Sequence, residues 1–165
     1  MKKILIILLF SYSSITHAGL LIEPYLGWDF GVGKTETTDV DFNSWDLGGR
    51  VGWIFKTLMV GVDADWKSMT PEFDSVEGAT VDVTNFGVFI GAWLPLMLNF
   101  RVGYVFSSTW ALENGDEDKG QGFSAGVGAR LFFLALNVDY KYLTYDSELS
   151  SNDILLSVSV PFNLF

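Results

Sequence analysis

The chain has 165 residues, of which 49% are hydrophobic and 16% aromatic, and its 20 acidic residues outnumber its 10 Lys and Arg for a formal net charge of −10. A balance this acidic excludes nucleic acid as a partner, because its phosphates would be repelled. The sequence holds no cysteine, which excludes disulfides and thiol chemistry.

The first segment has the pattern of an export signal. Two lysines precede an apolar run over residues 4–10, and Ala18 ends a small-residue cleavage site. The apolar run is well short of the roughly 20 residues that a membrane-spanning helix needs. We therefore expect residues 1–18 to be a cleaved signal peptide and residues 19–165 to form one exported domain.

From residue 20 onward, apolar residues alternate with polar residues or glycine at a period of two. Leu26, Trp28 and Phe30 share one phase of the first segment, whereas Asp29 falls on the other. Because side chains on a strand alternate between faces, one face is apolar and the other polar. The rhythm returns in eight segments, residues 20–32, 44–55, 58–67, 84–94, 98–110, 122–133, 134–145 and 153–162.

The links between these segments alternate in length. Tight turns are expected at residues 56–57, 95–97 and 133–134, and long polar loops at residues 33–43, 68–83, 111–121 and 146–152. Each segment is near the 9 to 11 or so residues that cross a bilayer as a tilted strand. The pattern predicts an all-β fold, an eight-stranded antiparallel up-and-down transmembrane β-barrel.

The apolar phase carries no charge and would face lipid. Aromatic residues on or beside it fall near the strand ends, where they would form two girdles. The expected girdle residues are Trp45, Trp66 and Trp110 at the loops, and Trp53, Phe55, Phe100, Phe133 and Phe162 at the turns.

The other phase holds most of the glycines together with charged residues. A small barrel has an interior just wide enough for side chains, so glycine leaves room for charged neighbours. Buried charges must be paired, which predicts a luminal salt-bridge network. Its expected members are Glu23, Asp29, Asp46, Asp63, Asp65 and Asp139, with Arg50, Lys67, Arg101, Arg130 and Lys141. An alternative is a narrow ion path in which an arginine exchanges acidic partners.

The remaining fourteen acids are expected in or beside the long loops, which would make that rim strongly negative. They are Glu36, Asp39, Asp41, Glu72, Asp74, Glu77, Asp82, Glu113, Asp116, Glu117, Asp118, Asp146, Glu148 and Asp153. Clustered carboxylates attract hard cations, so Asp116, Glu117 and Asp118 are weak metal candidates. Their spacing is not that of an EF-hand loop, and we expect a solvated acidic loop with no specific metal site.

Together these features resemble the outer-membrane β-barrel superfamily, which includes the OmpA transmembrane domain and OmpX-like small eight-stranded barrels. The motifs that carry the resemblance are Glu23-Pro24-Tyr25-Leu26-Gly27-Trp28, Gly49-Arg50-Val51-Gly52-Trp53, Arg101-Val102-Gly103-Tyr104 and Leu155-Leu156-Ser157-Val158-Ser159-Val160-Pro161-Phe162. The resemblance implies residence in the outer membrane of a Gram-negative bacterium, with tight turns and both termini in the periplasm. We expect no peptidoglycan-binding domain after the barrel.

Members of this superfamily end on a phenylalanine that the barrel assembly machinery reads together with alternating apolar residues. The matching positions here are Ile154, Leu156, Val158, Val160 and Phe162. The resemblance therefore implies that these residues are the assembly signal and that Asn163-Leu164-Phe165 is an extension.

Enzymatic activity is not expected. The single histidine, His17, lies in the signal peptide, so the mature chain has no histidine to activate a serine. No cofactor is expected either.

The function expected from the sequence is a structural or surface-interaction role in the outer membrane, with the loops as the contact surface. The alternative is a narrow pore or a small-solute or ion channel. The expected partners are outer-membrane lipid and lipopolysaccharide, contacted through divalent cations, and the barrel assembly machinery. We expect a monomer.

Overall fold

A computed structural model describes residues 19–35, 39–69, 80–94, 97–112 and 116–164. Its strands are β1 (Gly19–Lys34), β2 (Asp39–Phe55), β3 (Leu58–Met69), β4 (Val81–Trp93), β5 (Leu98–Leu112), β6 (Glu117–Leu131), β7 (Leu134–Tyr145), β8 (Ser150–Ser159) and β9 (Phe162–Leu164). Across these described ranges, no helix is long and apolar enough to cross a membrane. The signal peptide expected at residues 1–18 lies outside the described residues.

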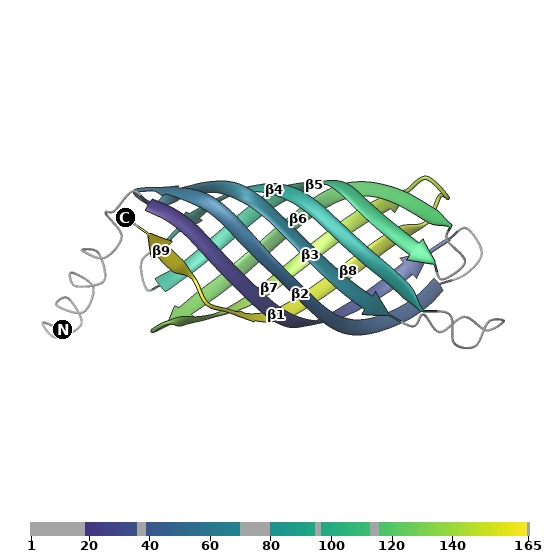
Figure 1. Ribbon diagram of the computed structural model, residues 1–165, viewed down its shortest axis with the longest axis horizontal. Helices are drawn as coiled ribbons and strands as arrows, with labels where there is room; N and C mark the ends of the chain where they lie inside the picture. Colours follow the sequence, from purple (N-terminus) through teal and green to yellow (C-terminus); the bar gives the residue numbers. More distant parts are fainter. Residues whose placement is uncertain (1–18, 36–38, 70–79, 95–96, 113–115, 165) are drawn as a thin grey trace, which may run out of the picture.

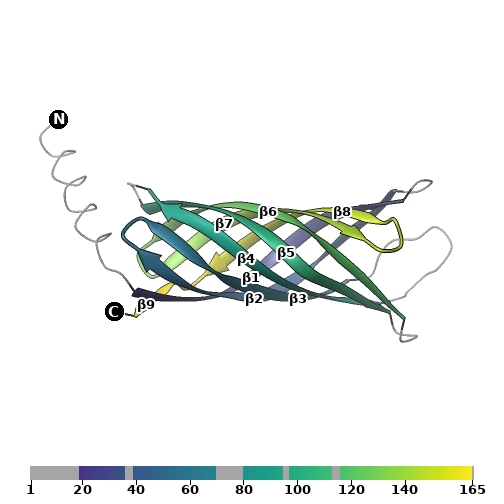
Figure 2. The ribbon, with the colours of Figure 1, turned by 90° about the horizontal axis from the view of Figure 1, so that it is seen from above.

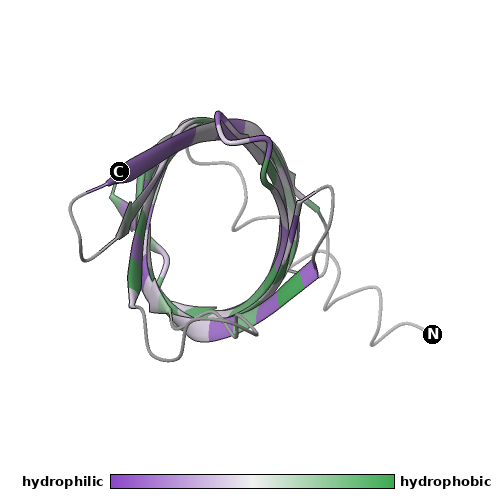
Figure 3. Cartoon of the chain, turned by 90° about the vertical axis from the view of Figure 1, so that its right-hand side faces the viewer, coloured by the Kyte–Doolittle hydropathy of each residue, from purple (hydrophilic) through white to green (hydrophobic). Residues whose placement is uncertain are grey.

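The strands form one closed antiparallel barrel. Each strand from β1 to β7 pairs with the next, and β1 also pairs with β8, which closes the sheet on itself. Figure 1 shows the strands tilted relative to the long axis, and Figure 3 shows the closed ring end-on. The prediction of an eight-stranded antiparallel up-and-down barrel is confirmed.

The two ends of the barrel differ in their links. At one end, which we call the turn end, β2 joins β3 and β6 joins β7 through two residues each, 56–57 and 132–133. The other end, the loop end, carries the links from β1 to β2, β3 to β4, β5 to β6 and β7 to β8. Figure 2 shows the two sets of links at opposite ends of the molecule.

Several strands are longer at the loop end than the sequence pattern predicted. The second strand begins at Asp39 instead of residue 44, and the sixth begins at Glu117 instead of residue 122. Polar composition indicated loops here, but cross-strand pairing continues through these residues, down to Lys34 opposite Asp39. The barrel wall therefore extends past its apolar belt and carries many of the acids expected in loops.

The last strand also differs from the prediction. The register that places Ser159 opposite Tyr25 continues unchanged to Phe162 opposite Ile22, so β9 prolongs β8 beyond Pro161. Residues 163–164, which the sequence predicts to be an extension beyond the assembly signal, pair with β1. Residue 165 lies outside the described part of the chain.

The outer surface carries a belt of exposed apolar side chains, as the alternation predicted. Trp45 is 62% exposed and contacts Trp28 edge-on, with 4.9 Å between ring centroids. Apolar side chains in this number on the outside of a closed barrel are covered by lipid.

One aromatic residue of the expected girdle points inward instead. The pairing of β5 with β6 shifts register between Val105 and Ser108. A bulge adds one residue to a strand and so exchanges its two faces from that point onward. Trp110 follows the bulge and is only 8% exposed, so its assignment to the lipid-facing girdle is wrong.

Candidate functional site

The lumen is the largest concentration of buried polar groups in the described chain, and it is layered along the barrel. An apolar cluster lies near the turn end, charged side chains fill the centre, and a second apolar cluster lies near the loop end. The first cluster consists of Leu21, Ile54, Met59 and Phe89, with Trp93 packed against it.

Arg50 organises the charged layer next to this first cluster. Its guanidinium donates to Glu23 Oε1 at 3.3 Å and to Asp139 Oδ2 at 2.7 Å, and it lies 4.4 Å from the centre of the Tyr25 ring. Arg101 reaches the other oxygen of Asp139 at 2.9 Å. One carboxylate therefore joins two arginines from different strands.

Further toward the loop end, two lysines form a second charged group. Lys67 donates to Asp29, and to Asp153 Oδ2 at 2.8 Å. Lys141 donates to Asp65 and lies 4.0 Å from Asp46 Oδ2. Both lysines are almost fully buried, so their ion pairs with these carboxylates are the main interactions that offset the free-energy cost of removing the ammonium groups from water.

The structure brings together ten of the eleven residues expected in the luminal network. Asp63 lines a small space beside Arg50 and Arg101. Arg130 lies elsewhere, because its guanidinium donates to the carbonyls of Phe132 at 3.1 Å and Pro161 at 3.2 Å near the turn end. Arg130 thus ties β6 to the chain before β9 and is not part of the luminal network.

Asp153 belongs to the lumen, although the sequence analysis placed it among the loop acids. It lies on β8, is 1% exposed and binds Lys67. The alternation of the sequence predicts this inward position, because Asp153 falls on the opposite phase from Ile154, which faces outward. The polar residues before it predict a loop, but they continue the strand.

These two corrections change the charge balance of the lumen. With Asp153 added to the six expected acids and Arg130 removed from the five expected bases, seven acids face four bases. Within the described residues, both carboxylate oxygens of Asp46 and one each of Asp29 and Asp153 lack a hydrogen-bond partner. The excess of acid is therefore concentrated around the two lysines.

Little free space remains among these charges. The cavity lined by Tyr25, Arg50, Asp63 and Lys141 measures about 10 Å³. A cavity needs roughly that volume to hold a single water molecule. The central layer is therefore packed with side chains at this point and leaves no room for a hydrated ion.

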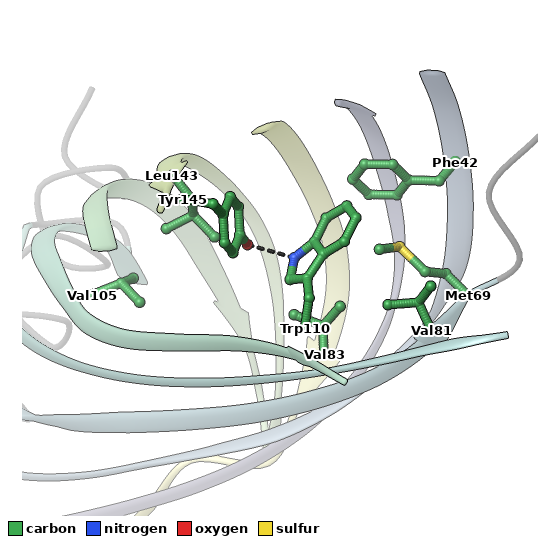
Figure 4. Close-up of a cluster of buried hydrophobic side chains, with 8 residues drawn as sticks. All are labelled: Phe42, Met69, Val81, Val83, Val105, Trp110, Leu143 and Tyr145. Atoms are coloured by element: carbon green, nitrogen blue, oxygen red, sulfur yellow. Dashed lines mark hydrogen bonds between the residues drawn. The ribbon is translucent and has the colours of Figure 1, made fainter. Parts of the chain in front are cut away.

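The apolar cluster at the loop end was not anticipated from the sequence (Figure 4). Trp110 Nε1 donates to the Tyr145 hydroxyl at 2.6 Å, and Phe42 meets Trp110 edge-on at 6.1 Å between ring centroids. The full cluster consists of Phe42, Met69, Val81, Val83, Val105, Trp110, Leu143 and Tyr145. Most of these residues keep the inward phase of their strands. The cluster could therefore be predicted from the apolar residues on that phase near the loop end.

Beyond the apolar belt, the outside of the loop end is acidic. We call this surface the rim. Its described acids are Asp39, Asp41, Asp82, Asp116, Glu117, Asp118, Asp146 and Glu148, and its bases are Lys34 and Lys119. Five expected loop acids lie outside the described residues, namely Glu36, Glu72, Asp74, Glu77 and Glu113.

The weak metal candidates lie on this rim. Asp118 accepts hydrogen bonds from the backbone nitrogen of Ser147, at 3.3 Å, and from its hydroxyl. A search of the described residues finds no group of three His, Cys, Asp or Glu placed to hold a metal ion. Asp118 therefore acts as a bridge between β6 and the β7–β8 link.

The expected assembly-signal residues lie along the seam that closes the barrel. Ile154, Leu156, Val158 and Phe162 are exposed on the outer face, and Val160 donates its backbone N–H to the Pro24 carbonyl at 3.1 Å. The assembly-signal residues therefore lie beside β1, where the barrel closes.

Comparison with known proteins gives the same architecture. No family model matches the sequence, and no curated protein matches it. Among solved structures, the chain is similar to Ail, the attachment invasion locus protein of Yersinia pestis, at 10% identity and a TM-score of 0.63, covering 87% of this chain and 99% of that one. Neisserial surface protein A gives 12% identity, a TM-score of 0.62 and coverage of 88% and 99%.

The outer membrane protein OprG from Pseudomonas aeruginosa gives 10% identity and a TM-score of 0.53, covering 87% of this chain and 96% of that one. At such low identities the likeness concerns the fold. The chain therefore has the fold of the small eight-stranded outer-membrane β-barrels.

Proposed function

We propose that this chain is a small integral protein of the Gram-negative outer membrane, with a structural or surface-interaction role carried by its acidic rim. The observation that carries the proposal is that, among the described residues, the lumen holds two apolar clusters with a charged layer between them, while the wall continues beyond the apolar belt. Side chains packed inside the barrel make it a rigid support for the surface at the loop end. The projecting wall offers contact surface outside the membrane.

The filled lumen argues against a pore. An ion entering from either end would have to pass an apolar cluster, where it loses water without gaining a partner. Beyond it, the charged layer offers a space of only about 10 Å³ beside Arg50. Each base in that layer is already bound to at least one acid.

The rim sets the chemistry of the partner. Eight described acids against two bases attract cations and repel anions. Divalent cations held diffusely by these carboxylates would bridge them to the phosphates of lipopolysaccharide. A basic protein surface would bind the rim directly. We further propose that Phe162 and the alternating residues before it guide assembly.

Planar-bilayer conductance of the refolded mature protein tests the proposal. We expect no unitary currents from the natural chain or from Arg101→Ala, provided that insertion is verified by protease protection. Reproducible currents that change with Arg101→Ala would replace the surface-interaction proposal by a channel. A second arm replaces the rim acids Asp39, Asp82 and Glu117 by amides, which should weaken binding to a cationic surface and leave insertion unchanged.

A further inference from the structure

A groove of about 430 Å³ crosses the outer surface near the loop end. It spans the closing seam of the barrel, from β2 over β1 and β8 to β7. Its principal lining residues are Phe30, Val32, Asp41, Asn43, Tyr140 and Asn152. Cross-strand pairing fixes this arrangement, because Val32 lies opposite Asp41 on one side and Asn152 on the other.

The groove lies where the apolar belt ends. On β2, the outward residues are Leu47 and Trp45 below it, followed by Asn43 and Asp41 at its edge. On β1, the Phe30 side chain is 47% exposed at the same level. One end of the groove therefore faces acyl chains and the other faces the headgroup layer.

The polar end offers hydrogen-bonding groups that the protein leaves unused. Within the described residues, Asp41 and Asn43 make no side-chain hydrogen bond or ion pair. Tyr140 donates its hydroxyl proton to Asn152 Oδ1 at 2.7 Å, which leaves the Asn152 amide N–H groups available. A carboxylate and two amides lie side by side here. They suit a ligand with several hydroxyl groups, because each hydroxyl both donates and accepts hydrogen bonds.

The charges of the groove disfavour a phosphate. Without a bridging divalent cation, Asp41 would repel it, and the base two residues beyond Val32 on β1, Lys34, is already paired with Asp39 at 3.5 Å. The rings of Phe30 and Tyr140 instead offer apolar faces for the C–H side of a sugar.

We propose that this groove binds an outer-leaflet lipid with a neutral glycosyl headgroup. Its sugar hydroxyls meet Asp41, Asn43 and Asn152, and the first part of an acyl chain lies along Phe30. The inference rests on the membrane insertion proposed above, and it assigns a lipid class to the edge of the apolar belt.

Native mass spectrometry of the mature protein in nanodiscs tests this inference. The discs contain monoglucosyl diacylglycerol, phosphatidylglycerol and phosphatidylethanolamine in equal amounts and with identical acyl chains. We expect the glucosyl lipid to remain bound about tenfold more often than phosphatidylglycerol. Val32→Trp fills the groove and should abolish this preference, whereas Val88→Trp, at an exposed position on β4, should keep it.

Charge reversal gives a second arm. Asp41→Lys should transfer the preference to phosphatidylglycerol, while Asp82→Lys makes the same charge change on the rim outside the groove and should not. Equal retention of the three lipids, preferred retention of phosphatidylethanolamine, or a preference that survives Val32→Trp would each overturn the inference. A protein that inserts normally but shows no preference overturns the glycolipid site alone, whereas failure to insert overturns the membrane proposal as well.

Discussion

Arg50 and Asp139 lie 89 residues apart in the sequence and meet inside the barrel, with 2.7 Å between Arg50 Nη2 and Asp139 Oδ2. Arg101 binds the other oxygen of the same carboxylate at 2.9 Å. Both arginines are buried. Asp139 therefore stabilises two buried guanidinium groups at once.

Replacement of Asp139 is expected to be the most damaging single change in the lumen. Asp139→Asn keeps the shape of the side chain but leaves Arg101 without a carboxylate within 4 Å among the described residues. Removing one partner of a buried ion pair costs about 3 to 5 kcal/mol. Urea unfolding of the vesicle-inserted protein should show a lower midpoint. An unchanged midpoint would mean that the arginines find water or other acids.

Asp46→Asn should behave in the opposite way, which makes it a matched control. Asp46 is 0% exposed, and neither of its oxygens has a hydrogen-bond partner within the described residues. Its base, Lys141, lies 4.0 Å away and also binds Asp65. Removing this poorly compensated charge should leave the free energy of unfolding unchanged or raise it. A loss comparable to that of Asp139→Asn would contradict this account of the charge excess.

Two glycines on β2 should differ in how well they tolerate a larger side chain, because one faces the lumen and the other faces outward. A Cβ added to Gly52 would lie 2.6 Å from the Val60 carbonyl oxygen, whereas the nearest neighbour of one added to Gly49 would be the Glu23 carbonyl oxygen at 3.9 Å. Gly52→Ala should destabilise the folded barrel by about 1 to 3 kcal/mol through overpacking. Gly49→Ala should be tolerated. Equal midpoints of unfolding for the two variants would argue against tight packing at the β2–β3 pair.

The closed barrel could be predicted from the sequence because a period of two, repeated over eight segments, leaves one face apolar and the other polar. The acids that bind Arg50, Lys67 and Arg101 in the lumen could be predicted to face inward, because they lie on the polar phase of their strands. The inward turn of Trp110 could not be predicted, because the bulge between Val105 and Ser108 has no sequence signature of its own. The inward position of Asp153 follows from its phase on the strand, although the polar residues before it favour a loop.

The position of Trp110 can be tested by fluorescence. In variants that retain one tryptophan each, acyl chains carrying bromine should quench Trp45, which is 62% exposed on the belt. They should not quench Trp110, which is enclosed by Phe42 and Tyr145. Comparable quenching of the two would place Trp110 on the lipid side and remove the bulge from the fold.

The acidic rim predicts that this chain binds polycations and not polyanions. Here, eight described acids on the rim face two bases, so a polyanion would be repelled. Isothermal titration of the vesicle-inserted protein should give no heat of binding for sucrose octasulfate.

A lysine-rich peptide should bind the same preparation, and its affinity should fall steeply as ionic strength rises, because exposed charges are screened within about 10 Å at 0.1 M salt. Replacing Asp39, Asp82 and Glu117 by amides should weaken this binding without altering the unfolding midpoint, since all three side chains are exposed. Binding of the polyanion, or peptide binding that is insensitive to salt and to these replacements, would show that the rim does not select its partner by charge.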